Sequence, residues 1–194
     1  MLFRSIYGSA NASNTIRGFE GDDQITGGLG FSQINGNLGS DTISGRSQVG
    51  DDLMGGQGAD VISTTQSTAH NRVNGNKGDD TITGSNFGDT LHGGQGADLI
   101  VGGSGNDWIS GDLGADTVSG GAGADRFHQF AGGGVSTVND FHYSEGDRVQ
   151  LDPGDTWRVS QQGSDVVVDI EGGGGLILRD VRLDSLGSDW IFAG

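Results

Sequence analysis

Aspartate recurs at a fixed spacing between Gly18 and His128, in lines of nine residues that also fix the places of their glycines. Gly93–Ser110 shows two such lines, GGQGADLIV and GGSGNDWIS, with glycine at positions 1, 2 and 4, aspartate at 6 and isoleucine at 8. Glycine permits tight turns that aim backbone carbonyl oxygens at one point. Calcium binds about six to eight hard oxygens from carboxylates and carbonyls. The spacing therefore predicts calcium chemistry, with the position-6 side chain as the carboxylate ligand.

The nine-residue line can be followed along most of the chain. Six lines run without interruption from Gly75 to His128, three from Gly18 to Ser44 and one from Gly55 to Ser63. Three degenerate lines complete the series, at Ser9–Arg17, Gly45–Met54 and Thr64–Asn74. Internal repeats of this kind indicate a solenoid in which each repeat packs on its neighbours.

Positions 7 to 9 of each line predict a short strand, with position 8 facing inward and positions 7 and 9 facing outward, because side chains alternate across a strand. The inward set is apolar throughout: Ile16, Ile25, Ile34, Ile43, Leu53, Ile62, Val73, Ile82, Leu91, Ile100, Ile109, Val118 and Phe127. One apolar residue per line gives a thin core. We therefore expect metal binding to contribute to folding.

The composition restricts the classes of partner. The chain has 194 residues and a net charge of −16, from 26 acidic and 10 basic side chains, so its surface repels nucleic acid and anionic membranes. It has no cysteine, which excludes disulfides and thiolate zinc sites. No apolar run is long enough to predict a membrane span. Met1–Ser5 fits no repeat, and the sequence leaves open whether these residues are native.

These lines resemble the calcium-binding nonapeptide GGxGxDxUx of RTX (repeats-in-toxin) proteins, where U is a large apolar residue. The resemblance implies an all-β fold, a right-handed parallel β-roll with two lines per turn, and Ca²⁺ ions between turns along both edges. Alternate lines then supply alternate edges. The first edge carries Asp23, Asp41, Asp60, Asp80, Asp98 and Asp116. The second carries Asn14, Ser32, Asp51, Asn71, Asp89, Asp107 and Asp125.

Because the second edge has non-acidic residues and both length irregularities in its N-terminal half, we expect it to bind calcium well only from about Asp89 onward. Asp51 is its one earlier carboxylate. Backbone carbonyls of the glycine-rich positions are the remaining expected ligands: Gly75, Lys77, Gly93, Gln95, Gly102, Ser104, Gly111, Leu113, Gly120 and Ala122.

The sequence divides into three predicted parts. Residues 1–17 form an N-terminal segment with a degenerate first repeat, residues 18–128 the calcium-binding roll, and residues 129–194 a β-rich cap. A cap is expected because an open roll end exposes its last inward side chains. The stretch from Asp140 to Leu151 and the tail Ser188–Gly194 also resemble the C-terminal end of RTX proteins exported by type I secretion, which implies an uncleaved export signal.

No catalytic constellation stands out: HExxH, GxSxG and P-loop motifs are missing from the sequence, and the four histidines are scattered. We therefore expect a secreted, non-enzymatic module that stays unfolded in the calcium-poor cytosol and folds on Ca²⁺ outside. Its expected partners are calcium and the type I secretion machinery, with an upstream domain or a polysaccharide as further candidates. Two alternatives remain open. One is a self-sufficient adhesin, surface-layer or polysaccharide-binding module, and the other is a fragment of an RTX enzyme such as an alginate epimerase or metalloprotease.

Overall fold

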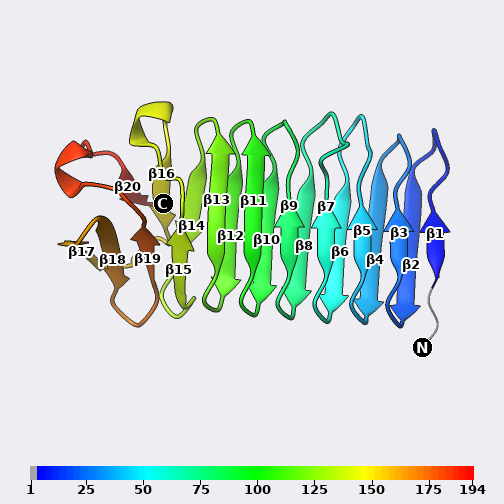
Figure 1. Ribbon diagram of the computed structural model, residues 1–194, viewed down its shortest axis with the longest axis horizontal. Coiled ribbons are helices and arrows are strands. Elements are labelled where there is room, and N and C mark those ends of the chain that lie inside the picture. Colours follow the sequence, from blue (N-terminus) through cyan, green and yellow to red (C-terminus); the bar gives the residue numbers. More distant parts are fainter. Residues whose placement is uncertain (1–3) are drawn as a thin grey trace.

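The computed structural model describes residues 4–194 and leaves Met1–Phe3, part of the segment that fits no repeat, outside the described residues. The described chain winds into a β-solenoid of about eight turns, and each turn adds one strand to each of two facing sheets (Figure 1). The predicted all-β parallel roll is therefore confirmed. The cap lies at the end of the solenoid opposite the N-terminus (Figure 1).

The first sheet has eleven strands in the order β1-β3-β5-β7-β9-β11-β13-β15-β19-β18-β17. Their bounds are β1 Ser5–Tyr7, β3 Gln24–Thr26, β5 Thr42–Ser44, β7 Val61–Ser63, β9 Thr81–Thr83, β11 Leu99–Ser104, β13 Thr117–Ala122, β15 Val135–Val138, β17 Trp157–Gln162, β18 Asp165–Ile170 and β19 Gly175–Leu178.

The second sheet has nine strands in the order β2-β4-β6-β8-β10-β12-β14-β16-β20. Their bounds are β2 Asn14–Glu20, β4 Ser32–Leu38, β6 Asp52–Gln57, β8 Arg72–Lys77, β10 Thr90–Gln95, β12 Trp108–Leu113, β14 Arg126–Gln129, β16 Arg148–Leu151 and β20 Ile191–Ala193. Two short 3-10 helices, η1 Tyr143–Glu145 and η2 Leu183–Ser185, lie in the C-terminal part. No helix in residues 4–194 is long and apolar enough to cross a membrane.

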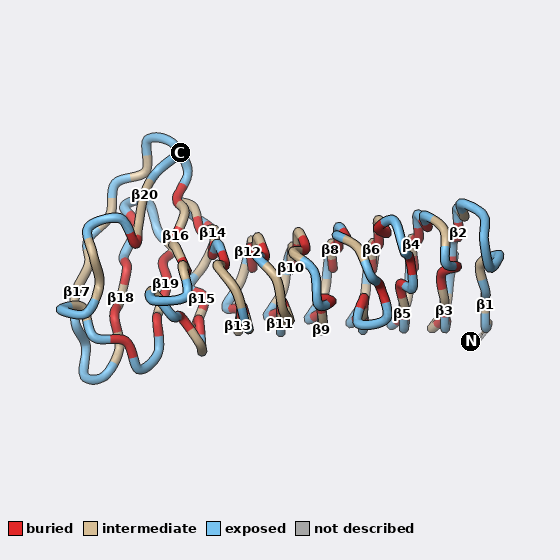
Figure 2. The backbone as a smooth tube through the Cα atoms, turned by 90° about the horizontal axis from the view of Figure 1, so that it is seen from above, coloured by how far each residue is buried: buried red, intermediate tan, exposed pale blue. Residues whose placement is uncertain are grey.

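The core is a stack of position-8 side chains, as predicted. All thirteen are buried, and buried residues line the inside of the coil along its whole length (Figure 2). Parallel pairing places like residues above one another, for example Ile25 on Ile43 and Ile82 on Ile100. The rows continue past the last repeat, because Val138 pairs with Val118 and Val149 pairs with Phe127.

Several strands are longer than the three residues expected from the pattern. β10 to β13 and the earlier strands of the second sheet continue from position 9 into the glycine-rich start of the next line. The strand bends there at a left-handed residue such as Gly94, whose φ is 111°. The glycines thus lie within the strands as well as in the turns, because a left-handed residue can bend a strand without ending it.

The cap changes the direction of pairing. The stretch SQQGSD is typical of a hairpin turn, and the strands that meet there, β17 and β18, form an antiparallel hairpin. β18 also runs antiparallel to β19, which in turn is parallel to β15. Val166, Val168 and Ile170 of β18 are buried with the end of the core. The two sheets are thereby closed at this end by strands that do not continue the repeat.

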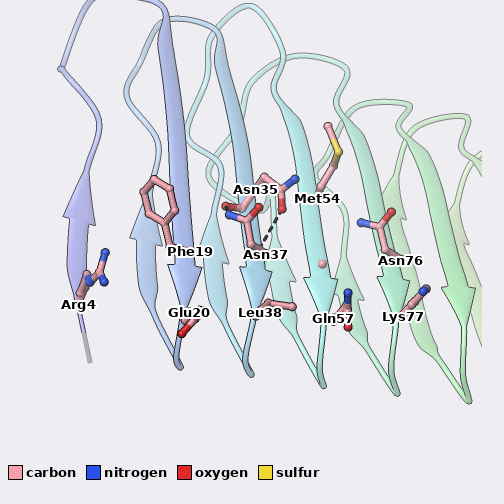
Figure 3. Close-up of a pocket in the computed structure, with 11 residues that line it drawn as sticks. Arg4, Phe19, Glu20, Asn35, Asn37, Leu38, Met54, Gln57, Asn76 and Lys77 are labelled. Carbon is pink, nitrogen blue, oxygen red and sulfur yellow. Dashed lines mark hydrogen bonds between the residues drawn. The ribbon is translucent and has the colours of Figure 1, made fainter. Parts of the chain in front are cut away.

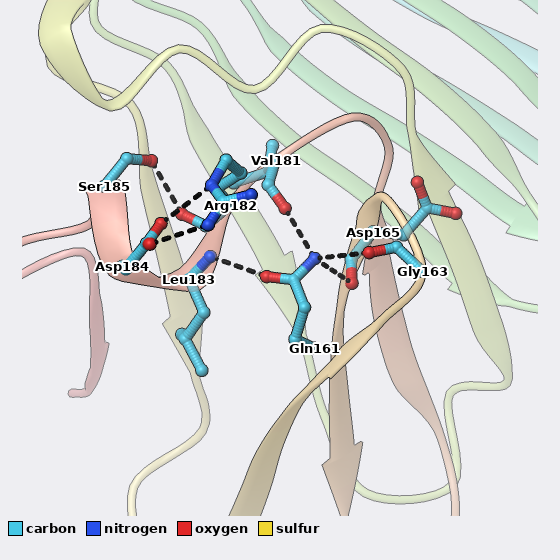
Figure 4. Close-up of polar contacts among 8 residues, drawn as sticks. All are labelled: Gln161, Gly163, Asp165, Val181, Arg182, Leu183, Asp184 and Ser185. Carbon is cyan, nitrogen blue, oxygen red and sulfur yellow. Dashed lines mark hydrogen bonds and ion pairs between the residues drawn. The ribbon is translucent and has the colours of Figure 1, made fainter.

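The Gln161 side chain joins the hairpin to the segment around η2 (Figure 4). Its Nε2 donates to the carbonyl oxygens of Asp165 and Val181, at 2.9 and 3.1 Å, and its Oε1 accepts from the backbone N–H of Leu183 at 2.7 Å. An Arg182–Asp184 ion pair closes the same turn. One amide side chain therefore satisfies backbone groups of two segments that are some twenty residues apart.

The stack predicts a sharp difference between two adjacent residues. Ile100 is fully buried, whereas Leu99 on the outer face is 46% exposed. At saturating calcium, Ile100→Ala should lower the free energy of unfolding by about 2–5 kcal/mol, the usual effect of a core truncation. Leu99→Ala is the matched control and should change it by less than about 0.5 kcal/mol. Denaturant titration measures both, and similar losses would contradict the inward assignment of position 8.

Candidate metal-binding edges

Six buried aspartates form a hydrogen-bonded ladder along the first edge of the roll. The backbone N–H of each aspartate donates to Oδ1 of the aspartate one turn further on, at 2.7–3.0 Å. The members are Asp23, Asp41, Asp60, Asp80, Asp98 and Asp116. These residues are at most 2% exposed, and the structure thus aligns the six first-edge residues along one edge.

The other carboxylate oxygen has a different environment. Oδ2 is buried and accepts no hydrogen bond within residues 4–194 in seven aspartates, and such an atom carries a large desolvation cost. These aspartates are Asp23, Asp41, Asp60, Asp80, Asp98, Asp107 and Asp125. A row of buried carboxylate oxygens without donors is the arrangement expected where a cation balances them.

A backbone carbonyl of the next turn lies beside six of these seven Oδ2 atoms, the exception being that of Asp125. A β-carbon added at Gly93 would collide with Asp98 Oδ2 and lie 2.7 Å from the carbonyl oxygen of Gly111. The same holds at Gly75 for Asp80 Oδ2 and the Gly93 carbonyl. The first glycine of the line therefore keeps open the space where a carboxylate and a carbonyl of successive turns converge. These hard oxygens fit calcium.

The five first-position carbonyls that the sequence predicts as ligands all lie beside the preceding turn in this way. The carbonyls of Gly75, Gly93, Gly102, Gly111 and Gly120 each lie against the first glycine of the preceding turn. The third-position carbonyls are already used between turns: those of Lys77, Gln95, Leu113 and Ala122 accept N–H groups of Gly58, Gly78, Gly96 and Gly105 at 2.8–3.0 Å. A carbonyl has a second lone pair, so this bond still leaves an acceptor site.

The second edge carries a ladder of the same kind. Its Oδ1 atoms, or the equivalent amide oxygen of Asn71, accept backbone N–H groups from Ser32 onward at 2.6–3.1 Å. The ladder extends beyond the repeats, because Asp125 N–H donates to Asp147 Oδ1 at 2.9 Å. Sequence analysis missed Asp147, which stands 22 residues after Asp125 and so falls outside the nine-residue period.

Three carboxylates of the second edge are bonded through both oxygens. Asp89 Oδ2 accepts the N–H of Ser85 at 2.7 Å, and Asp51 Oδ2 accepts those of Arg46 and Ser47 at 3.0 and 3.1 Å. Asp147 Oδ2 likewise accepts the N–H of His142 at 2.7 Å. In these three aspartates, backbone N–H groups therefore donate to Oδ2. In Asp107 and Asp125 the same oxygen accepts no hydrogen bond.

The residue at position 2 separates the two kinds of line. In the lines whose Oδ2 has no donor it has a left-handed backbone, whether it is a glycine, as in Gly103 with φ 115° and Gly121 with φ 96°, or another residue, as in Asn76 with φ 75°. Arg46 and Ser85 occupy this position in the lines of Asp51 and Asp89, and neither has a positive φ. Their N–H groups donate to the carboxylate instead. The second glycine of the motif is not by itself a sequence signal for this difference, because the lines of Asp23, Asp41 and Asp80 also lack it and keep a donor-free Oδ2.

On the first edge, Asp116 differs from its neighbours because its Oδ2 accepts the hydroxyl of Ser136 at 3.1 Å. Within residues 4–194 no three His, Cys, Asp or Glu side chains come together as a metal-binding group. Any cation here would therefore be held by one carboxylate per turn together with backbone carbonyls.

Burial raises the pKa of most ladder carboxyls. Desolvation is the largest cause, and like charge from neighbouring ladder residues adds to it. The pKa is raised to about 7 for Asp60, Asp98 and Asp107, and to about 6 for Asp80 and Asp125. The pKa of Asp41, Asp51, Asp116 and Asp147 is also raised by burial. A stack of ionised carboxylates is therefore unfavourable without compensating positive charge.

The family model of the RTX calcium-binding nonapeptide repeat matches most of the solenoid. The matched segments are residues 11–34, 17–49, 50–65, 67–98, 83–118 and 92–127. The chain belongs to this family. Its RTX module has the calcium-binding repeat and the β-roll of the family, and the ladder aspartates lie at the repeat's carboxylate position.

Two solved structures are similar to this RTX module. The extracellular lipase LipA from Serratia marcescens is 18% identical over 96% of this chain and 40% of the lipase chain, with a TM-score of 0.52. The AlgE6R3 subunit of the mannuronan C5-epimerase from Azotobacter vinelandii is 27% identical over 61% of this chain and 80% of that chain, with a TM-score of 0.49. The likeness to the lipase concerns the fold alone, and the chain spans less than half of the lipase's length. No curated protein sequence matches the chain significantly.

The raised pKa values predict how the calcium-free protein responds to pH. A carboxyl whose pKa is higher in the folded state stabilises the fold fully below its ordinary pKa of 3.8. That contribution is lost as pH rises through about 6 to 7, the values of the ladder carboxyls. In the absence of calcium, circular dichroism should show more β-structure at pH 5 than at pH 8. Equal spectra, or more β-structure at pH 8, would contradict the burial of these carboxyls.

Proposed function

We propose that this chain is an RTX module whose β-roll folds when Ca²⁺ binds outside the cell, and that its folding supports type I secretion. The observation that carries the proposal is the row of seven buried Oδ2 atoms without donors, six of which lie beside a carbonyl of the next turn. Belonging to the calcium-binding repeat family supports the choice of calcium as the cation.

The ligands we propose are the carboxylates with a donor-free Oδ2, together with the first-position glycine carbonyls. They are Asp23, Asp41, Asp60, Asp80 and Asp98 on the first edge and Asp107 and Asp125 on the second. Asp51 and Asp89, also expected as ligands, have both carboxylate oxygens bonded to backbone N–H groups. We therefore place the start of the calcium-binding part of the second edge at Asp107 rather than at Asp89.

Asp116 takes a separate place in this proposal. Its Oδ2 accepts a hydroxyl, which can rotate its hydrogen away and offer its own oxygen instead. Asp116 thus remains a candidate ligand, with Ser136 as its neighbour. Bound calcium would supply positive charge between carboxylates of successive turns and so remove their repulsion.

Dependence of folding on calcium follows from how the ligands are brought together. The Oδ2 atom of Asp98 and the carbonyl of Gly111 converge beside Gly93 only when successive turns are stacked. The unfolded chain has no preformed site of this kind, so calcium binds the folded state far better. Binding free energy then appears as folding free energy. The thin core of one apolar position-8 residue per line adds to this dependence.

The secretion part of the proposal rests on the C-terminal tail. Ile191, Phe192 and Ala193 form β20, which pairs with β16 at the end of the second sheet, and Trp190 is buried. A tail that acts as an export signal would thus be accessible to the secretion machinery only before the roll folds. The low calcium level of the cytosol would keep the roll unfolded, and the tail accessible, until export. An upstream domain and the lack of catalytic activity in this chain stay predictions.

The experiment is a calcium titration followed by far-UV circular dichroism, starting from chelator-treated protein at pH 7.5 and using magnesium as the control. We expect a cooperative transition from coil to β-structure with calcium and none with magnesium, because Mg²⁺ demands a tight octahedral shell and dehydrates reluctantly. A complete β-roll spectrum in excess chelator at this pH would contradict calcium-dependent folding.

A further inference from the structure

A groove crosses the outer face of the second sheet near its N-terminal end. It has a volume of about 790 Å³ and runs over β2, β4, β6 and β8 (Figure 3). Phe19, Leu38 and Met54 give it apolar surface, and the amides of Asn37 and Asn76 lie along it. A smaller hollow next to it shares Asn35 and Met54 and reaches Arg17. None of these side chains belongs to the aspartate ladders.

Phe19 holds a strained conformation on the outer face of the sheet, where the guanidinium carbon of Arg4 lies 6.0 Å from its ring centroid. Its φ is 75°, in the left-handed region that is unfavourable for a bulky residue, and its side chain is 58% exposed. The same row of the sheet carries Asn37, Gly56, Asn76 and Gly94, which are residue types that tolerate this backbone. An exposed aromatic ring in a strained conformation indicates a role for the ring itself.

The neighbouring asparagines are held in place by short local contacts. Asn35 Oδ1 accepts the N–H of Asn37 at 2.9 Å, drawn as a dashed line in Figure 3, and Asn74 Oδ1 accepts the N–H of Asn76 at 2.9 Å. The Nδ2 groups of Asn37 and Asn76 also donate to the carbonyl oxygens of Asn35 and Asn74, at 3.1 and 3.3 Å, so the amide oxygen of each side chain is the group left for a ligand. Amides at a fixed spacing are suited to hydroxyl groups, which both donate and accept hydrogen bonds.

Positive charge is concentrated on this face of an otherwise acidic chain. Arg4 and Lys77 lie at opposite ends of the groove, and Arg17 and Arg72 stand on the same sheet (Figure 3). These four cations take part in none of the ion pairs found within residues 4–194. Glu20 is the one acidic side chain that lines the groove. The strands of the first sheet from β1 to β13 contain no lysine or arginine.

We propose that this groove binds a linear acidic glycan, a polymer that carries both carboxylates and ring hydroxyls. Phe19 would stack on the apolar face of a sugar ring, the amides of Asn37 and Asn76 would bind hydroxyls, and Arg4 and Lys77 would pair with carboxylates. Adjacent strands are about 4.8 Å apart, so a chain of sugar rings crossing them meets about one strand per ring. The proposal needs the folded roll but not its export.

The test measures binding of uronic acid hexasaccharides to the full chain by calorimetry at saturating calcium, with cellohexaose and polyglutamate as probes of the alternatives. Phe19→Gly and Phe19→Asn place in this row residue types that already occur there, so folding should be unchanged or more stable. Both should weaken binding by at least about tenfold, the scale of a lost aromatic contact. Lys77→Gln should weaken binding and reduce its salt dependence, whereas the matched control Arg126→Gln on β14 should do neither.

Several outcomes would overturn the proposal. They are no binding of any uronic acid hexasaccharide, equal binding of polyglutamate, tighter binding of cellohexaose, or unchanged affinity of the Phe19 variants. Circular dichroism of each protein at the same calcium level separates this failure from that of calcium-dependent folding. A chain that is folded but does not bind would disprove the glycan site alone.

Discussion

The fold depends on one constraint, namely that each turn must stack on the next through a buried carboxylate. Asp98 shows it most simply: its Oδ1 holds the backbone N–H of Asp80, while its Oδ2 is left without a donor beside the carbonyl of Gly111. The first contact sets the register between turns. The second leaves negative charge in a dry environment, where the ionised form is unfavourable without a cation. Stacking and metal binding therefore depend on the same side chain.

The two edges meet this constraint in different ways. Along the first edge almost every turn presents a donor-free Oδ2, so the charge accumulates from turn to turn. Along the second edge, backbone N–H groups donate to Oδ2 of Asp51 and Asp89. In the lines with a donor-free Oδ2, the position-2 residue has a left-handed backbone and its N–H does not make this bond. A solenoid is held together by contacts between neighbouring turns, so each turn's dependence on metal is a local property. Under the proposed assignment of calcium sites, the N-terminal half of the roll binds cations on one edge and the C-terminal half on both.

Much of this arrangement follows from the nine-residue period. The period predicts the inward position-8 row, and the resemblance to the RTX repeat, with two lines per turn, implies the alternation of lines between two sheets and the alignment of Asp23 to Asp116 on one edge. The hairpin of β17 and β18 also follows from its turn residues. These features depend on residue type and spacing alone, which is the information a sequence contains directly.

Other features depend on backbone angles and on insertions, which the pattern does not encode. Asp147 joins the second ladder because the loop before it, which includes η1, absorbs the extra residues. The bonding of Asp89 depends on the direction of one N–H at Ser85, and the projection of Phe19 depends on its positive φ. The extension of strands into the glycines has the same origin, because a strand can bend at a left-handed residue and continue.

The central claim is that donor-free Oδ2 atoms mark the calcium sites, and it is tested most directly by counting bound calcium in two variants. Native mass spectrometry can compare Asp98→Asn with Asp89→Asn at the same free calcium. The account predicts that Asp98→Asn lowers the number of tightly bound ions, while Asp89→Asn keeps the full number even if it weakens the fold. Loss of calcium from Asp89→Asn with none from Asp98→Asn would contradict it.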